Sequence, residues 1–245
     1  MFPLSHTYVS TRVLKRQPPN LVFGSVLPDI ATTSKNNIGR DKIHYSPNEF
    51  LSFVKSKYPE LIDIAIGVNL HSHINKGADY YSDDSTTGFA YTYGKNLVSK
   101  VKHLLKIEDD TISLVLSHNL IEAGVDINLL RKNPEVLEIY TNGFQKIDKE
   151  KIVSCLSQYL ALPKDTLKLE IDNFITFLGP ESISSVDTII DRVAIPLIQL
   201  RFNCKVDRGE TVSIISEAAR LMEREYIRLL DQAVRGITSS KTIEV

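Results

Sequence analysis

The histidines of this chain are unevenly placed. All six lie between positions 6 and 118, and the following 127 residues have none. Because a neutral imidazole is the commonest protein ligand for zinc and similar ions, this crowding indicates a metal site in the N-terminal half. The ordinary alternative for any one histidine is a surface residue or a hydrogen-bonded core residue, so the surrounding sequence has to separate them.

His118 and Glu122 form the sharpest pair. They belong to the apolar segment 112–122, in which an unpaired polar ring would be costly. Residues four apart project from one face of a helix, and Asp126 continues that face by one more turn. A His-x-x-x-Glu pair can therefore supply two ligands to one metal ion. The alternative for this spacing is a buried histidine that is hydrogen-bonded to the glutamate.

His71 ends a second apolar segment, residues 64–71. If a helix continues through Gly77, the four-residue rule adds Asn75 and then Asp79 to the face that carries His71. We therefore expect a second group of ligands on this face.

The other candidates are weaker when taken singly. Asp29 ends an apolar run, where a carboxylate is seldom buried unless it is paired or bound to metal. His6 and His44 have no such context and gain weight only from their order in the chain. His73 points to the other side of the helix from His71, and His103 stands among lysines that would repel a cation.

Helices have to position these residues, because strand signatures are almost absent. Apolar residues recur at helical spacing through most of the chain, and Pro, Gly and Asp punctuate them. The longest expected helices cover residues 60–78, 85–105, 110–130 and 210–234. No repeat, low-complexity tract or linker divides the chain, so we expect one all-α domain over residues 1–245. Residues 1–130 would build the metal site.

The order of the candidate ligands resembles that of the zinc-dependent phospholipase C superfamily, which also contains fungal single-strand nucleases. The matching residues are His6, Asp29, His44, His71 and the pair His118 and Glu122. Asp29 ends a segment that looks like the family's Gly-x-x-x-Pro-Asp motif. The resemblance implies an all-helical core, zinc ligation by these residues and hydrolysis of phosphate esters.

The chain departs from this family in ways that bear on the number of metals. Four residues after the core-helix histidine the family has a bridging aspartate, where this chain has Asn75. The chain also lacks the tryptophan that secreted members use as a ligand. We therefore expect one or two divalent ions, zinc or else manganese, with Asn75 in the aspartate's place. A weaker similarity to bacterial acyl-carrier-protein phosphodiesterases, over residues 70–79, also points to phosphodiester chemistry.

The resemblance also implies roles. It places Asp29, His44 and His71 around one ion and His118 with Glu122 around another, with His6 or Asp79 as a further ligand of the second ion. A free carboxylate would act as general base, and Asp29 and Asp79 are both open for that role. Arg40 or Lys42 could hold a phosphate, although loop charges are usually just solvated.

Composition narrows the class of protein. The 29 basic and 30 acidic residues give a net charge of −1, which does not favour nucleic-acid binding through a global basic field. The two cysteines form no motif, no signal peptide is evident and no apolar run is long enough to span a bilayer. We therefore expect a cytoplasmic protein, with its oligomeric state left open.

Two functions fit these observations. The first is a metal-dependent hydrolase that acts on a small phosphoester or a lipid headgroup. The second is a helical scaffold or binding module that retains a structural ion but has lost turnover, since fold resemblance does not by itself carry function. Asn75, in place of an acid, keeps this second function open.

Overall fold

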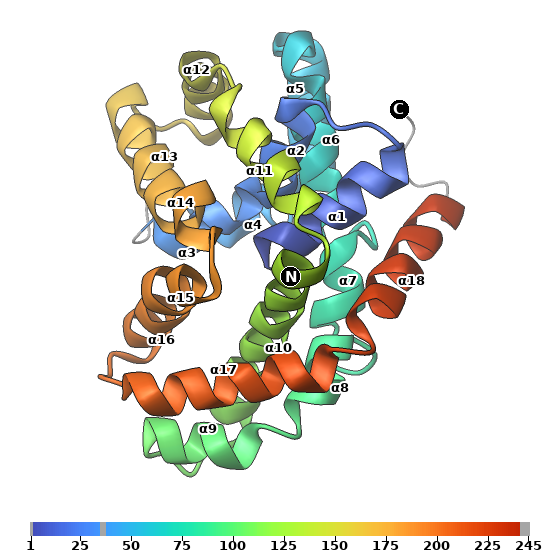
Figure 1. Cartoon of the computed structure of the whole chain (residues 1–245). Helices are drawn as coiled ribbons and strands as arrows, with labels where there is room; N and C mark the ends of the chain where they lie inside the picture. The colour runs from blue at the N-terminus through green and yellow to red at the C-terminus, as the bar shows by residue number, and fades with distance from the viewer. Residues whose placement is uncertain (1, 35–37, 241–245) are drawn as a thin grey trace.

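Helices account for the architecture of the computed structural model, which describes residues 2–34 and 38–240 (Figure 1). No strand occurs within these ranges, so the expected all-α fold is confirmed. In chain order the helices are α1 (Pro3–Leu14), α2 (Pro19–Val26), η1 (Leu27–Asp29), α3 (Ile30–Thr33), α4 (Arg40–Ile43), α5 (Pro47–Lys57), η2 (Pro59–Leu61), α6 (Ile62–His71), α7 (Ala78–Asp83), α8 (Phe89–Gly94), α9 (Val98–Leu105), α10 (Asp110–Lys132), α11 (Glu135–Gln145), α12 (Lys149–Leu160), α13 (Lys164–Leu178), α14 (Pro180–Ile183), α15 (Val186–Thr188), η3 (Ile189–Ala194), α16 (Ile195–Phe202), α17 (Arg208–Met222) and α18 (Tyr226–Ser239).

Helix α10 runs through the middle of the molecule and carries the predicted His118–Glu122 pair (Figure 1). It begins after Asp109, whose side chain accepts a hydrogen bond from the backbone N–H of Ile112 at 2.9 Å. That bond satisfies one of the donors that every helix start leaves open. Arg131 and Lys132 lie in the last turn, where positive charge is favourable. The predicted helix over 110–130 is therefore present almost as expected.

The predicted helix over 60–78 is wrong, because the chain turns sharply after His71. Lys76 has a φ of 52°, in the left-handed region, and Gly77 follows it. A Cβ added to Gly77 would lie 2.3 Å from the carbonyl oxygen of Leu70, so only glycine fits this close return. Asp79 therefore reaches the site on a separate helix, α7, and not on an extension of α6.

The predicted helices over 85–105 and 210–234 are each broken into two. The first becomes α8 and α9, and the break follows Gly94, whose added Cβ would lie 3.1 Å from the backbone nitrogen of His118. The second becomes α17 and α18. Helix α17 crosses α10, whereas α18 turns to lie along α1, where Asp231 accepts a hydrogen bond from the Tyr8 hydroxyl at 2.7 Å (Figure 1). Tertiary packing decides both breaks.

Two glycines allow α2 and α6 to touch at the backbone. A Cβ added to Gly24 would lie 2.3 Å from the carbonyl oxygen of Ile64, and one added to Gly67 would lie 2.6 Å from the carbonyl carbon of Gly24. The close crossing brings Asp29, which follows α2, toward His71 at the end of α6.

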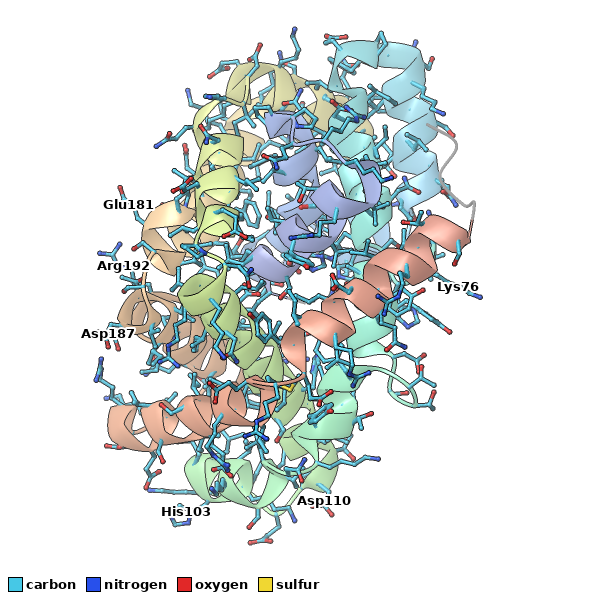
Figure 2. All side chains as sticks on the ribbon, turned by 45° about the vertical axis from the view of Figure 1, so that its right-hand side comes forward. Lys76, His103, Asp110, Glu181, Asp187 and Arg192 are labelled. Carbon is cyan, nitrogen blue, oxygen red and sulfur yellow. The ribbon has the colours of Figure 1, made fainter. Side chains whose placement is uncertain are left out.

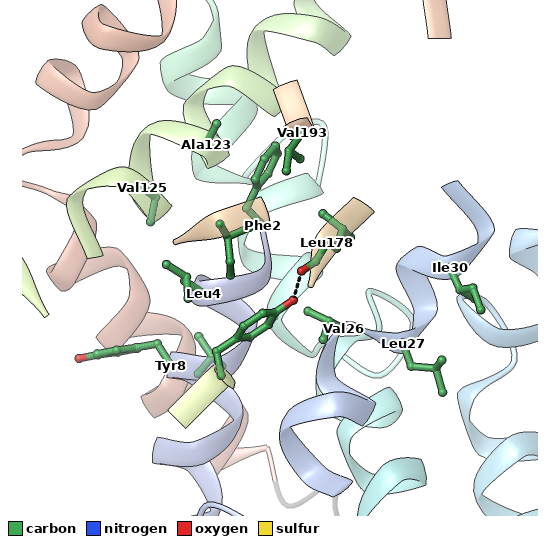
Figure 3. Close-up of a cluster of buried hydrophobic side chains, with 14 of the residues drawn as sticks. Phe2, Leu4, Tyr8, Val26, Leu27, Ile30, Ala123, Val125, Leu178 and Val193 are labelled. Atoms are coloured by element: carbon green, nitrogen blue, oxygen red, sulfur yellow. Dashed lines mark hydrogen bonds between the residues drawn. The ribbon is translucent and has the colours of Figure 1, made fainter. Parts of the chain in front are cut away.

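Apolar side chains from distant parts of the chain fill the interior around this crossing. Figure 3 shows Leu4, Val26 and Val125 converging from three helices, with the carbonyl of Leu178 accepting a hydrogen bond from buried Tyr140. Charged side chains project outward, as the labelled residues of Figure 2 illustrate. Among the helices described here, none is both long and apolar enough to cross a membrane.

Candidate metal centre

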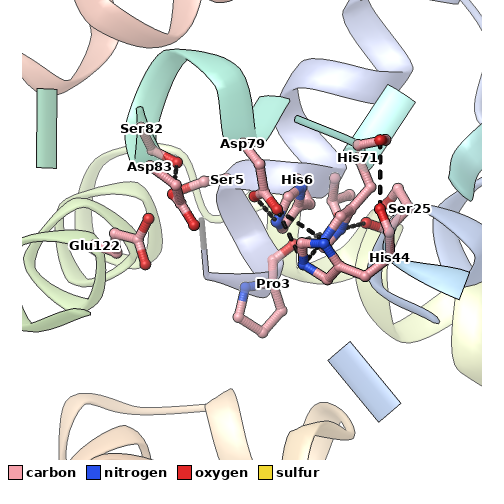
Figure 4. Close-up of polar contacts among 12 residues, drawn as sticks. Pro3, Ser5, His6, Ser25, His44, His71, Asp79, Ser82, Asp83 and Glu122 are labelled. Carbon is pink, nitrogen blue, oxygen red and sulfur yellow. Dashed lines mark hydrogen bonds and ion pairs between the residues drawn. The ribbon is translucent and has the colours of Figure 1, made fainter. Parts of the chain in front are cut away.

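Two groups of histidines and carboxylates could each hold a metal ion. Site 1 consists of His6, Asp29, His44, His71 and Asp79, and site 2 consists of Asp83, His118 and Glu122. The members come from several segments of the chain, with Asp79 and Asp83 both on α7 and His118 and Glu122 both on α10. Figure 4 shows Asp79 pointing from α7 toward the histidines while Asp83 points toward Glu122. All eight residues lie between positions 6 and 122.

The carboxylate of Asp79 contacts all three histidines of site 1. Its Oδ1 lies 3.3 Å from His6 Nε2, and its Oδ2 lies 3.2 Å from His44 Nε2 and 3.1 Å from His71 Nε2. These four side chains are at most 4% exposed, so their polar atoms have little access to water. Ligands of a tetrahedral zinc ion lie about 3.4 Å from one another, since each is about 2.1 Å from the metal. The spacing in site 1 matches that geometry.

In the neutral form of His71, a lone pair is directed into site 1. Its Nδ1 lies 2.9 Å from the carbonyl oxygen of Ser25, which can only accept, so Nδ1 carries the hydrogen. The Nε2 of the neutral ring is then a lone pair facing Asp79 and, at 3.3 Å, His44 Nε2. Either a proton on Nε2 or a metal ion would satisfy these atoms. Burial disfavours the charged ring, but the carboxylates of Asp79 and Asp29 favour it and raise the pKa of His71. The same negative charges would favour a metal ion at this position.

His6 is held as a neutral imidazole. Its ring stacks on His71 with centroids 3.9 Å apart, and its Nδ1 has no hydrogen-bond partner among the described residues. Burial, together with the nearby charge of His71, lowers the pKa of His6 to about 4. The neutral imidazole is the form that binds metal, so no proton has to leave His6 near pH 7.

The first turn of α1 is anchored on α10, and this fixes His6. Asp126 is buried there and accepts hydrogen bonds from the backbone N–H of Leu4 at 2.7 Å and of Ser5 at 2.9 Å. The hydroxyl of Ser5 also bonds to Asp126. A carboxylate at a helix start is favourable because it satisfies open N–H groups and faces the positive end of the helix dipole.

Site 2, on α10 and α7, has a histidine oriented by a backbone carbonyl in the same way as His71 in site 1. His118 Nδ1 donates to the carbonyl oxygen of Val115 at 2.9 Å, which leaves Nε2 as a lone pair. That Nε2 lies 3.7 Å from Asp83 Oδ2 and 3.7 Å from Glu122 Oε2, too far for hydrogen bonds and suitable for a shared metal ion. The ring of Tyr91 stacks on His118 at 4.6 Å and fixes its plane.

The two carboxyl groups of site 2 cannot both be charged without a cation. Burial and the charge of Asp83 raise the pKa of Glu122 to about 8. Burial opposes ionisation of Asp83 as well, but its contacts with His118 and Glu122 lower its pKa below the ordinary value. A cation shared by the two carboxyl groups, either a proton or a metal ion, would relieve this unfavourable interaction.

Both sites open onto one cavity of about 470 Å³. Asp79 and Asp83, one helical turn apart on α7, connect them. Asp29, His44, His118 and Glu122 line the cavity, as do Arg40 and Arg201. The wall also contains apolar side chains from both halves of the chain, among them Phe2, Val115, Phe177, Leu178, Val193 and Leu197, and polar ones such as Asp84, Ser85 and Asn119.

The structure places some sequence candidates apart from both sites. The amide of Asn75 bonds to Asn48 and Asn69 in the turn after α6, so the helical geometry on which its ligand role was predicted does not exist. His73 lies at the cavity wall, 3.5 Å from Asp84, and His103 is exposed near Glu210.

Asp83 was not among the ligands predicted from the sequence. Its signal was its position four residues after Asp79, which becomes informative only once a helix is known to begin after Gly77. Arg201 carried no signal at all, because it lies 80 residues beyond the last ligand-bearing segment. Of the two basic residues considered near His44, Arg40 lines the cavity, and Lys42 is not among the described residues that do.

The chain matches no family model, no curated protein and no solved structure. The geometry of the two sites and the order of their residues are therefore what indicates a function.

Proposed function

We propose that the protein is a metal-dependent hydrolase of phosphate esters. The observation that carries the proposal is the opening of two adjacent ligand groups onto one cavity, with Asp79 and Asp83 between them. Paired divalent ions are a recurrent arrangement for phosphoester hydrolysis. The resemblance in ligand order to the zinc-dependent phospholipase C superfamily supports the same chemistry.

Zinc is the metal that we propose for these sites. Imidazole nitrogens and carboxylate oxygens at near-tetrahedral spacing suit zinc, and manganese is the alternative for a carboxylate-rich group. When bound, such ions lower the pKa of a water molecule toward neutrality and polarise a phosphoryl oxygen.

The two acids of site 1 take different roles in this proposal. Asp79 faces histidine nitrogens with both oxygens, which suits a metal ligand. Asp29 is only half-buried and lines the cavity. We therefore assign Asp29 as the general base that accepts a proton from the attacking water, a group that has to reach the substrate directly.

The position of Asp79 also bears on the scaffold alternative. That alternative rested on Asn75 standing where an acid was expected. In the fold, an acid reaches His71 from α7, so site 1 has a carboxylate between its histidines even though Asn75 lies elsewhere. The hydrolase is for this reason the function that we favour.

Metal content and turnover test the proposal together. Protein purified without chelator should contain zinc or manganese, and it should hydrolyse p-nitrophenyl phosphate or bis(p-nitrophenyl) phosphate. The variants His71→Ala and Glu122→Gln should each lose one bound ion and most of the activity. His103→Ala is the matched control, because this histidine is exposed and distant from the cavity lining.

Two outcomes would count against the hydrolase. Stoichiometric metal without turnover of either ester would favour the scaffold. Absence of any transition metal, with no change in melting temperature when zinc or manganese is added, would remove both functions.

A further inference from the structure

Two arginines from opposite ends of the chain face the same cavity. Arg40 is the first residue of α4, and Arg201 lies near the end of α16. The guanidinium of Arg40 reaches site 1, where its Nη2 lies 3.0 Å from His44 Nε2. Arg201 lies on the side of site 2, where its charge acts on Tyr91, the residue that stacks on His118. Both arginines therefore line the cavity onto which the two sites open.

Neither arginine is paired with a carboxylate, whereas some other arginines are. Arg16 and Arg208, for example, each make paired contacts with an aspartate, at 2.6–3.0 Å and 2.8–3.0 Å. Neither Arg40 nor Arg201 forms an ion pair within residues 2–34 and 38–240. Burial and the charge of Arg40 lower the pKa of Arg201, as expected of like charges that share a cavity without an anion.

Metal loading would release Arg40 toward the cavity. In this structure His44 Nε2 is the acceptor for Arg40. The same nitrogen cannot bind an ion and accept that hydrogen bond at once, so the guanidinium then needs another acceptor. An anion in the cavity is the acceptor within reach, and a planar guanidinium binds phosphate oxygens in pairs.

The charges of the cavity indicate which anion fits. Sites 1 and 2 contain four carboxylates, Asp29, Asp79, Asp83 and Glu122, whose charges two divalent ions would balance. The two guanidinium groups then leave an excess of two positive charges at the sites. The remaining carboxylate of the cavity wall, Asp84, accepts hydrogen bonds from Thr86 and Thr87 and lies 3.5 Å from His73. A terminal phosphate carries nearly two negative charges at pH 7 and three non-bridging oxygens, whereas a phosphodiester carries one charge and two such oxygens.

We propose that Arg40 and Arg201 form an anion clamp that selects terminal phosphate groups, so that the preferred substrates are phosphate monoesters. This inference rests on the proposed function and narrows it, because the resemblance alone points to diesters. The apolar wall formed by residues such as Phe177 and Leu197 would contact the organic group of the ester.

Binding of inorganic phosphate tests the clamp without requiring turnover. Isothermal titration of the zinc-loaded protein should show phosphate binding that weakens about tenfold or more in Arg40→Gln and in Arg201→Gln, since each loses a charge-assisted contact. Arg201→Lys should restore part of the affinity. Arg131→Gln is the control, because Arg131 is an exposed arginine outside the cavity lining. Melting temperatures will show that each variant is folded.

Hydrolysis tests the selectivity. The wild-type kcat/KM should be higher for p-nitrophenyl phosphate than for bis(p-nitrophenyl) phosphate, and Arg201→Gln should reduce that ratio. Unchanged phosphate affinity in both glutamine variants would overturn the clamp. A preference for the diester would overturn the selection of terminal phosphates while leaving the hydrolase intact. Phosphate binding that depends on both arginines, with no turnover of either ester, would uphold the clamp and refute the hydrolase.

Discussion

Substituting Gly67 by alanine should separate α6 from α2 and disturb site 1 at a distance. A Cβ on Gly67 would lie 2.6 Å from three backbone atoms: the carbonyl carbon of Gly24, the carbonyl oxygen of Leu21 and the nitrogen of Ser25. Ordinary contact begins near 3.4 Å. The helices therefore have to move apart by about 0.8 Å, because backbone atoms cannot rotate out of the way as a side chain can.

That movement would break the hydrogen bond that orients His71. Gly67 lies one turn before His71 on α6, and the acceptor, the carbonyl of Ser25, lies on α2. Moving α6 by about 0.8 Å would lengthen this 2.9 Å bond to about 3.7 Å, which is no longer a hydrogen bond. Overpacking of this kind costs roughly 1–3 kcal/mol of stability. Loss of a partner that orients a metal-binding histidine lowers metal affinity about 10–100-fold.

Two measurements on Gly67→Ala separate these effects. Urea unfolding of the metal-free protein gives the loss of stability, and competition with a chromophoric chelator gives the zinc affinity. Gly209→Ala is the control, since its Cβ would meet only Asp207 Oδ1, at 3.1 Å, on an exposed helix start. We expect that control to be neutral or slightly stabilising. Unchanged stability in Gly67→Ala would refute the packing argument, and unchanged zinc affinity in a destabilised variant would refute the link to His71.

Three further predictions follow from the buried charges. Asp126→Asn should cost about 1–3 kcal/mol, because an amide nitrogen would face the N–H of Leu4 or Ser5. Burial raises the pKa of Asp126 to about 6, above its unfolded value of about 3.9, so this carboxyl stabilises the fold increasingly as pH falls from about 6 to about 4, by up to about 3 kcal/mol. Urea unfolding at pH 5 and pH 7 in chelator should show that the variant lacks this contribution, and equal pH dependence in both proteins would contradict it. Asp83→Asn should remove one bound ion, measured by elemental analysis, and retention of both ions would exclude Asp83 as a ligand. Adding zinc at 100 times its dissociation constant should stabilise the chelated protein by about 2.7 kcal/mol, and a constant melting temperature would show that zinc does not bind the folded state.

The helical class was predictable because apolar periodicity and capping are local properties. Helix α10 illustrates this, since Asp109 caps it and its buried face repeats every three to four residues. The interruptions after Gly94 and Met222 were not predictable in the same way. Neither contains a proline, and each is decided by the helix against which the next segment packs.

The residues of the candidate site were likewise predictable where local spacing relates them, and not where a contact between helices does. The pair His118 and Glu122 shares one helix, so its spacing was visible in the sequence. Asp79 was expected through a helix that does not exist, and it reaches His71 because the turn at Gly77 starts a new helix beside the old one. Periodicity could not assign Asp83, because its relation to His118 is a contact between two helices.

The C-terminal half has a physical role even though it contains none of the candidate ligands. Helix α17 packs on α10 at Gly124, where an added Cβ would lie 2.7 Å from the backbone of Ala218. This packing fixes the position of the helix that carries His118 and Glu122. Helices α13 and α16 supply Phe177, Leu197 and Arg201 to the cavity. The N-terminal half thus provides the groups that could bind metal, while the C-terminal half forms the wall that a substrate would meet. Substitutions in α16 should therefore change which ester is bound and leave metal content unaltered.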